Sequence, residues 1–383
     1  MSPSQLGVYK YVMFNISFWV FMSDITMDTI IIPTPTPTKT IALYLAGLAS
    51  LTSPFGGTVC CDFKATLDMV CNKFQFVKNP SNDVWKEMAT EIYNNMGWKI
   101  SLHDYKSFLE GFESDNFAFI VAIDKASGRN AACIIGAHYP SHNGSRGIFP
   151  LGLYYVKPEY RGNGLGQALF DKLLQLAEGA NIFLHSAPAM AEKYIDRSGF
   201  DKRANWNVIS VNAALKDCDL TKLSVNNDLL VVNFEEVDLE KLAEYDQSIA
   251  AGVGRTRFLQ KFLTQPEVFN KFALDEEGSI IGACNARLVL GNKIALGPFY
   301  AESPEIASTL LKYTLGSIPN LSSYDRIYSH ASSANTDAIQ LFQSMVNGPL
   351  DTTRVIPRLF NKEVINIPGE KVYGVTDTNV TFV

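Results

Sequence analysis

The clearest chemistry in this chain belongs to one short turn, Arg161-Gly162-Asn163-Gly164-Leu165-Gly166. A strand is expected to end just before it, at Lys157-Pro158, and a helix to begin within it, at Leu165. The first amides of a helix have no partner within the helix and point outward at its positive end. Glycines let an anion approach that backbone closely. The turn therefore predicts a phosphate-binding site.

Two familiar phosphate motifs do not fit this turn. No Lys-Ser or Lys-Thr pair follows the glycines as a P-loop requires, and Gln167 stands where GxGxxG needs its third glycine. Nucleoside triphosphates and dinucleotides are therefore disfavoured, while Arg161 adds a guanidinium beside an anion of another kind. The alternative is that the glycines only relieve crowding between a strand and a helix.

The spacing of apolar residues predicts the elements that hold this turn. Helices are expected at 84–96, 102–113, 165–180 and 188–197, and strands at 117–123, 131–139, 148–156 and 181–185. The order strand, turn, helix, strand predicts that strands 148–156 and 181–185 are parallel.

The second half of the chain repeats this order. Helices are expected at 239–250, 304–313 and 336–345, and strands at 268–274, 280–288, 293–299 and 326–330. The repetition indicates a duplication. We expect a disordered N-terminal extension over 1–72, domains over 73–215 and 229–383, and a linker over 216–228 between them.

The run from Val156 to Gly166 resembles the Arg/Gln-x-x-Gly-x-Gly/Ala motif of the GNAT superfamily of N-acetyltransferases. Ala191 to Phe200 resembles a later GNAT motif that ends in Gly-Phe. The second half resembles the C-terminal YitH/HolE-type domain of tandem GNAT proteins. The residues that carry this second likeness are Gly254 to Leu259, Gly297 to Ala301, Asn335, Ala338, Leu341 and Phe342.

The resemblance implies an α/β (α+β) fold of two tandem GNAT-like domains, each with a mixed, mostly antiparallel twisted sheet flanked by helices. It also implies acetyl-coenzyme A as cosubstrate, without a metal. Strands 148–156 and 181–185 would splay apart around the pantetheine. The residues implied to bind the coenzyme are Tyr154, Tyr155, Val156, Arg161, Gly162, Asn163, Gly164, Leu165 and Gly166.

The catalytic residue implied by the resemblance is Tyr194, as the acid that protonates the departing thiolate. Many GNAT enzymes carry this tyrosine four residues before the Gly of Gly-Phe, where this chain has Ile195. One residue is about 100° around a helix, so packing in the core is an equal alternative for Tyr194. His185, Glu159 and Glu192 are candidates for the base, and none of them is assigned.

The turn after the strand at 293–299 is Ala301-Glu302-Ser303-Pro304-Glu305, which has two carboxylates and no glycine. Such a turn repels a pyrophosphate, so we expect the second domain to complete the substrate cleft or a homodimer surface. Arg255 and Arg257 lie in a stretch that we predict to be irregular, where they either hold an anionic group or are solvated.

Composition restricts the partners. A net charge of −6 and a pI near 5.5 disfavour nucleic-acid binding. Six cysteines form no CxxC pair, which disfavours zinc. The apolar runs Tyr11 to Met22 and Ile41 to Leu51 are shorter than the roughly 20 residues that span a bilayer. A cytoplasmic protein without stable membrane insertion is expected, with secretion or anchoring through these runs left open.

We therefore predict an enzyme, an N-acyltransferase that transfers an acetyl group to a small amine or a lysine side chain by direct attack in a ternary complex. The alternative is a catalytically inactive sensor or scaffold that binds acyl-coenzyme A without turnover. A membrane-anchored protein that uses the first 50 residues is a third hypothesis.

Overall fold

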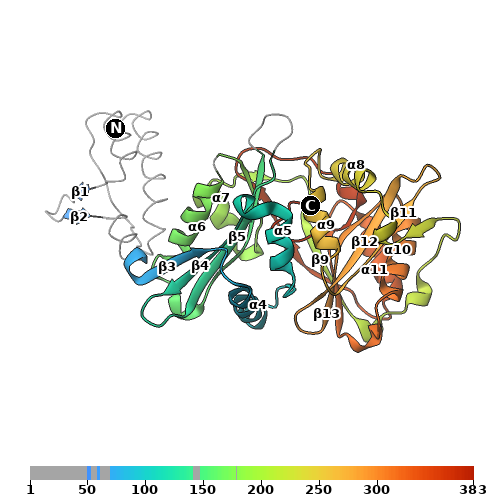
Figure 1. Cartoon of the computed structure of the whole chain (residues 1–383), viewed down its shortest axis with the longest axis horizontal. Helices are drawn as coiled ribbons and strands as arrows, with labels where there is room; N and C mark the ends of the chain where they lie inside the picture. The colour runs from blue at the N-terminus through green and yellow to red at the C-terminus, as the bar shows by residue number, and fades with distance from the viewer. Residues whose placement is uncertain (1–49, 53–57, 61–69, 141–146, 178) are drawn as a thin grey trace, which may run out of the picture. The chain divides into compact units, whose positions relative to one another are not determined.

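The computed structural model describes residues 50–52, 58–60, 70–140, 147–177 and 179–383 (Figure 1). Most of the predicted N-terminal extension and most of the polar turn at 141–147 lie outside this part of the chain. By contacts the chain divides into two compact units. One contains 120–133 and 154–174, with the glycine turn, and the other contains 79–119, 134–153 and 175–383.

A seven-stranded sheet carries most of the first half of the chain. Its order is β3 (Phe74–Lys78), β4 (Phe117–Asp124), β5 (Asn130–Ala137), β6 (Ile148–Val156), β7 (Asn181–His185), β16 (Arg358–Phe360) and β8 (Lys202–Arg203). Its helices are α4 (Asn82–Met96), α5 (Asp104–Asn116), α6 (Leu165–Leu176) and α7 (Ala191–Ser198).

An eight-stranded sheet carries most of the second half. Its order is β10 (Leu230–Val232), β11 (Val268–Leu274), β12 (Ile280–Val289), β13 (Lys293–Ala301), β14 (Arg326–Ser332), β9 (Val208–Ala214) and β15 (Asp351–Ile356), and β17 (Val372–Gly374) pairs with β13. Its helices are α8 (Leu239–Ile249), α9 (Thr256–Leu263), α10 (Pro304–Gly316) and α11 (Thr336–Met345). A separate pair is formed by β1 (Ser50–Thr52) and β2 (Thr58–Cys60).

The predicted fold class is confirmed, with two mixed sheets flanked by helices. The pairs β6–β7 and β13–β14 are parallel, as the strand–helix–strand order predicts. Helix α6 ends at Leu176, four residues before the predicted end. Each sheet also contains a strand from the other half of the chain, since β16 lies between β7 and β8 and β9 lies between β14 and β15.

The prediction of an irregular stretch at Arg255 and Arg257 is wrong, because helix α9 begins at Thr256. Its side chains Phe258, Leu259, Phe262 and Leu263 are buried. The ring of Phe258 lies 4.8 Å from the ring of Phe112 in α5. Gly111 of α5 permits this approach, because a Cβ there would lie 2.9 Å from the Cα of Phe258. Burial of one apolar stripe against α5 thus stabilises a helix of only eight residues.

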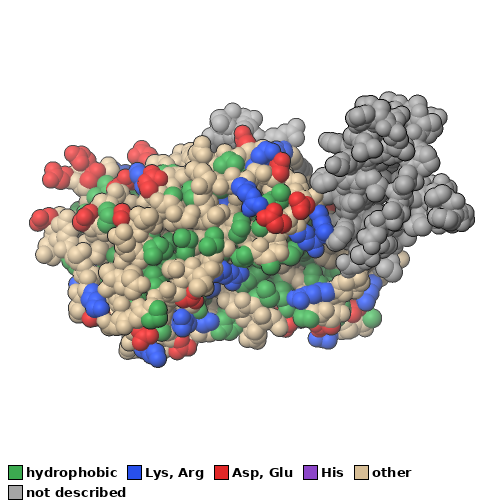
Figure 2. Space-filling model, turned by 180° about the vertical axis from the view of Figure 1, so that it is seen from behind, with side chains coloured by type: hydrophobic (Ala, Val, Ile, Leu, Met, Phe, Trp, Pro, Cys, Tyr) green, Lys and Arg blue, Asp and Glu red, His purple; other side chains and the backbone are tan. Residues whose placement is uncertain are grey.

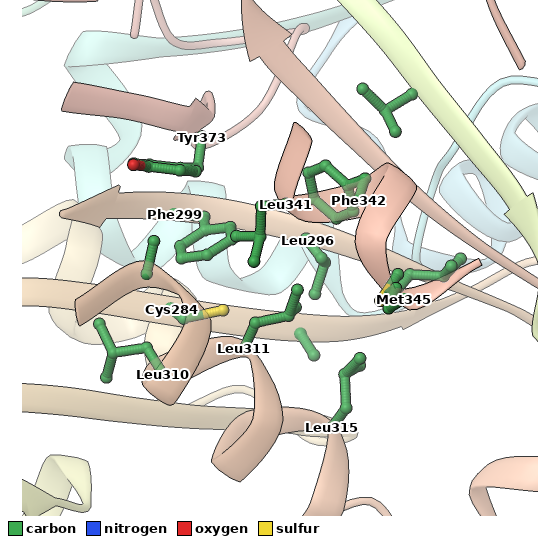
Figure 3. Packing of buried hydrophobic residues seen from close by; sticks show 14 of the residues in the cluster. Cys284, Leu296, Phe299, Leu310, Leu311, Leu315, Leu341, Phe342, Met345 and Tyr373 are labelled. Atoms are coloured by element: carbon green, nitrogen blue, oxygen red, sulfur yellow. The ribbon is translucent and has the colours of Figure 1, made fainter. Parts of the chain in front are cut away.

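One hydrophobic core lies between the second sheet and helices α10 and α11 (Figure 3). Its labelled members are Cys284, Leu296, Phe299, Leu310, Leu311, Leu315, Leu341, Phe342, Met345 and Tyr373. The ring of Phe299 lies 5.1 Å from that of Tyr373 and 6.5 Å from that of Phe342. This core closes one face of the sheet and leaves the side chains of Lys293, Tyr328 and His330 on the other face.

Basic and acidic side chains lie interspersed among uncharged ones on the face shown in Figure 2. In the part of the chain that the structure covers, no helix is long and apolar enough to cross a membrane.

Candidate coenzyme site

The glycine turn is anchored on both sides of a short 3₁₀ helix, η2 (Pro158–Tyr160). Before it, the amide of Lys157 donates to the carbonyl of Ala131 at 2.9 Å. At its last residue, the buried Tyr160 donates its hydroxyl to Asp124 Oδ2 at 3.3 Å, and its ring lies edge-on to that of Phe74 with the centroids 5.8 Å apart. The chain therefore leaves β6 on a fixed course into the turn.

The three glycines meet two different requirements. Gly162 and Gly164 have φ of 78° and 80°, which disfavours other residues. A Cβ on Gly162 would meet nothing within 4 Å, so this position faces open space. Gly166 lies in the first turn of α6, where a Cβ would come within 2.6 Å of the Tyr154 hydroxyl and 3.3 Å of Val156 Cγ2. Glycine there lets the helix begin directly against β6.

The charges of the turn suit an anion. Arg161 donates its Nε to the carbonyl of Val156 at 2.9 Å, and its guanidinium carbon lies 5.9 Å from the centroid of the Tyr155 ring. This holds the guanidinium beside the end of β6. The carboxylate of Glu159 is paired with Arg129 at 3.3 Å on the surface. The amide of Leu165 has a long contact of 3.4 Å with Asn163 Oδ1. The start of α6 thus places backbone N–H donors beside the guanidinium of Arg161.

Strand β6 pairs with β7 along its first part, where Ile148 to Leu151 lie opposite Asn181 to Leu184, which is nearly all of β7. Beyond that ladder, Leu153 has φ of 47°, which is rare for a bulky residue and bends the strand. A Cβ on Gly152 would lie 2.5 Å from the carbonyl oxygen of Asn379, so the C-terminal segment packs directly on β6. The backbone of Tyr154 to Val156 thus continues past its ladder with β7.

Tyr194 and His185 are both half-buried, and their surroundings shift the pKa of each. Burial raises the pKa of Tyr194 to about 12, and its ring lies edge-on to Phe200 at 6.0 Å. Burial, followed by the charges of Arg358 and His330, lowers the pKa of His185 well below its usual value. Tyr194 is therefore a phenol and His185 a neutral imidazole at pH 7.

Arg358 of β16 lies opposite His185 and is a residue that sequence reasoning missed. Its guanidinium is buried, stacks 3.5 Å from the centroid of the Trp206 ring, and donates Nη2 to the carbonyl of Phe382 at 2.7 Å. Burial lowers its pKa to about 9. Only the pairing of β16 with β7 brings this cation to the end of β7, and no local pattern reveals that pairing.

The arginines of the second half are already engaged. Buried Arg255 forms a bidentate pair with Asp246 and also donates to Val383 O at 3.0 Å. Arg257 is exposed and pairs with Glu113 of α5. Both guanidinium groups are therefore already paired with carboxylates, and neither is left to bind an anionic substrate group.

The turn after β13 differs from the turn after β6. The Ser303 hydroxyl accepts from the amide of Ile306 at 3.3 Å and caps α10, while Glu302 pairs with Lys371 at 2.6 Å. Strand β17 also lies where β13 and β14 diverge: Val375 N donates to His330 O at 2.9 Å, and a Cβ on Gly374 would lie 3.2 Å from Leu296 O. The gap where β13 and β14 diverge, which we call the second splay, is thus filled by the chain itself.

Comparisons with solved structures agree with this fold. A putative acetyltransferase from Pyrococcus horikoshii aligns with a TM-score of 0.58 and 16% identity over 81% of this chain and 96% of that one. A tandem GNAT protein from the clavulanic acid biosynthesis pathway aligns with a TM-score of 0.55 and 14% identity over 80% and 100% of the two chains. An uncharacterized protein of Caenorhabditis elegans is 23% identical over 241 residues, 62% of this chain and 74% of that protein.

The sequence also matches two family models. Residues 83–200 match the Acetyltransferase (GNAT) family, and residues 242–374 match an Acetyltransferase (GNAT) domain. The first match contains the glycine turn and the second contains the filled splay. The chain belongs to the GNAT acetyltransferases and carries two of their domains in tandem.

Proposed function

We propose that this protein transfers an acetyl group from acetyl-coenzyme A to an amine, either a small molecule or a lysine side chain. The observation that carries the proposal is the turn at the start of α6, where Gly162 faces open space at positive φ beside Arg161. The pyrophosphate would accept from the turn amides while the guanidinium offsets its charge.

The continuation of β6 beyond its ladder with β7 supports the position of the thioester. Pantetheine amides would pair with the main chain of Tyr154 to Val156, as a further strand does. A backbone N–H there would polarise the thioester carbonyl, and such a donor contributes about 3 to 4 kcal/mol in the transition state. The amine would attack directly, after loss of its ammonium proton.

The proton for the departing thiolate is proposed to come from Tyr194. Its pKa of about 12 keeps it protonated at neutral pH. An ordinary thiol has a pKa of about 8.5, so the transfer from this phenol is uphill unless bound substrate lowers the tyrosine pKa. This penalty is the observation that favours the alternative, a sensor that binds acyl-coenzyme A without turnover.

We propose one coenzyme site per chain. β17 lies in the second splay, and the helix after β13 is capped by Ser303 with Glu302 and Glu305 nearby. A pyrophosphate at that turn would meet carboxylates instead of open amides.

Release of free coenzyme A thiol tests the proposal. The full chain, with acetyl-coenzyme A and either small amines or lysine peptides, should release thiol only when an acceptor is present. At subsaturating acetyl-coenzyme A, a Gly162→Asp variant should release thiol more slowly than the parent, and a Gly97→Asp variant should match the parent. Coenzyme binding without thiol release from any acceptor would instead support the sensor.

A further inference from the structure

A small pocket opens on the second sheet, on the face opposite the core of Figure 3. Lys99, from the loop between α4 and α5, lies at this pocket. Tyr328 and His330 of β14 and Thr378 of the C-terminal segment also line it. This pocket contains neither the glycine turn nor the residues that we assign to catalysis.

Strand register gathers cations on this face. Lys293 of β13 lies opposite Arg326 of β14, and Ser210 of β9 lies opposite both His330 and Arg354. Side chains in register point to the same face of a sheet, and those two residues apart along a strand share it as well. Lys293, Arg326 and Arg354 therefore lie on the face that carries Tyr328 and His330.

Lys99 is held close to these cations. Its ammonium nitrogen lies 4.2 Å from the centroid of the Tyr328 ring, and that of Lys293 lies 5.8 Å from the same centroid. Burial, with the charges of Arg354 and Lys293, lowers the pKa of Lys99 to about 8. The crowding of like charges thus costs free energy that a bound anion would offset.

Asp377, which lines the pocket, and Asp351, which lies near Lys99, are already engaged. Asp351 accepts from Thr353 at 2.8 Å and from Asn212 at 3.2 Å. Asp377 accepts from the amide of Asn379 at 2.6 Å and lies 3.5 Å from the buried guanidinium of Arg287. Lys99 has no carboxylate within ion-pair distance in the part of the chain that the structure describes.

We propose that this pocket binds the carboxylate or phosphate group of a small anionic ligand. Lys99 would supply the central charge, and Arg354 and Arg326 would attract the anion from the same face. His330 and Thr378 would offer hydrogen bonds, and Tyr328 a flat wall. The site is separate from the proposed coenzyme turn and does not depend on it.

Calorimetric titration of the full chain with inorganic phosphate, at constant ionic strength in a chloride buffer, tests the site. Lys99→Met should weaken binding by at least about tenfold, because it removes the lysine charge that lines the pocket. Arg354→Gln should weaken it less. Lys241→Met is the matched control, since this half-buried lysine of α8 donates to Glu277 O at 2.8 Å and should bind as the parent does.

A Gly162→Asp variant separates this pocket from the coenzyme turn. It should keep the Lys99-dependent phosphate binding even though its coenzyme affinity is weakened. The same titration with acetate distinguishes a carboxylate ligand from a phosphate ligand. The proposal is overturned if the parent binds neither anion, or if Lys99→Met and Arg354→Gln both keep the parental affinity.

Discussion

Gly162 and Gly97 offer a matched pair of sites for a carboxylate. Both have positive φ, 78° and 67°, and a Cβ at either would meet nothing within 4 Å. Gly97 ends α4, where its amide donates to Tyr93 O at 2.8 Å. Aspartate tolerates this conformation better than most residues, so each Gly→Asp change should cost at most about 1 kcal/mol in folding free energy.

Only Gly162→Asp places its charge at the proposed pyrophosphate position. Two like charges 4 Å apart repel by about 1 kcal/mol in water and about 4 kcal/mol near a protein surface. The predicted loss of acetyl-coenzyme A affinity is therefore between about fivefold and several hundredfold. Gly97→Asp should bind as the parent does.

Isothermal titration calorimetry gives the two affinities, and thermal melts verify that both variants are folded to the same extent. Parental affinity in a folded Gly162→Asp would refute the placement of the pyrophosphate at this turn. An equal loss in both variants would show that the effect is global.

Three other changes probe catalysis and stability. If the Tyr194 phenol is the acid, Tyr194→Phe should lower kcat at least about tenfold in steady-state kinetics, with little change in coenzyme affinity. An unchanged kcat would show that this side chain serves only in packing. Arg287→Met should cost about 3 to 5 kcal/mol in urea denaturation, because it strands the buried carboxylates of Asp104 and Asp377; a loss below about 1 kcal/mol contradicts this. Burial lowers the pKa of His330 from 6.5 to about 3, so the unfolded chain gains a proton first as pH falls. Stability should drop by at most about 4 kcal/mol between pH 6.5 and 3, and His330→Gln should flatten that part of the curve; an identical curve would argue against a buried neutral imidazole.

The parts of the fold that depend on local spacing could be predicted from the sequence. β6, β7 and the beginning of α6 coincide with the predicted elements, because β-branched and aromatic runs, a proline stop and glycines act within a few residues of each other. The positive φ of Gly162 and Gly164 follows from the same local chemistry.

The parts of the fold that depend on long-range pairing could not be predicted from the sequence. β16 lies beside β7 and β9 beside β14, although more than a hundred residues separate the members of each pair. The positions of Arg358, His330 and the cations around Lys99 follow from these registers. Helix α9 was missed because tertiary contact with α5, and not length or capping, stabilises it.

The central claim is that the first domain alone holds the coenzyme. The stoichiometry of acetyl-coenzyme A binding to the full chain, measured by isothermal titration calorimetry, tests it most directly. We predict one molecule per chain, with binding at least about fivefold weaker in Gly162→Asp. Binding of two molecules, of none, or of one that persists unchanged in Gly162→Asp would contradict the claim.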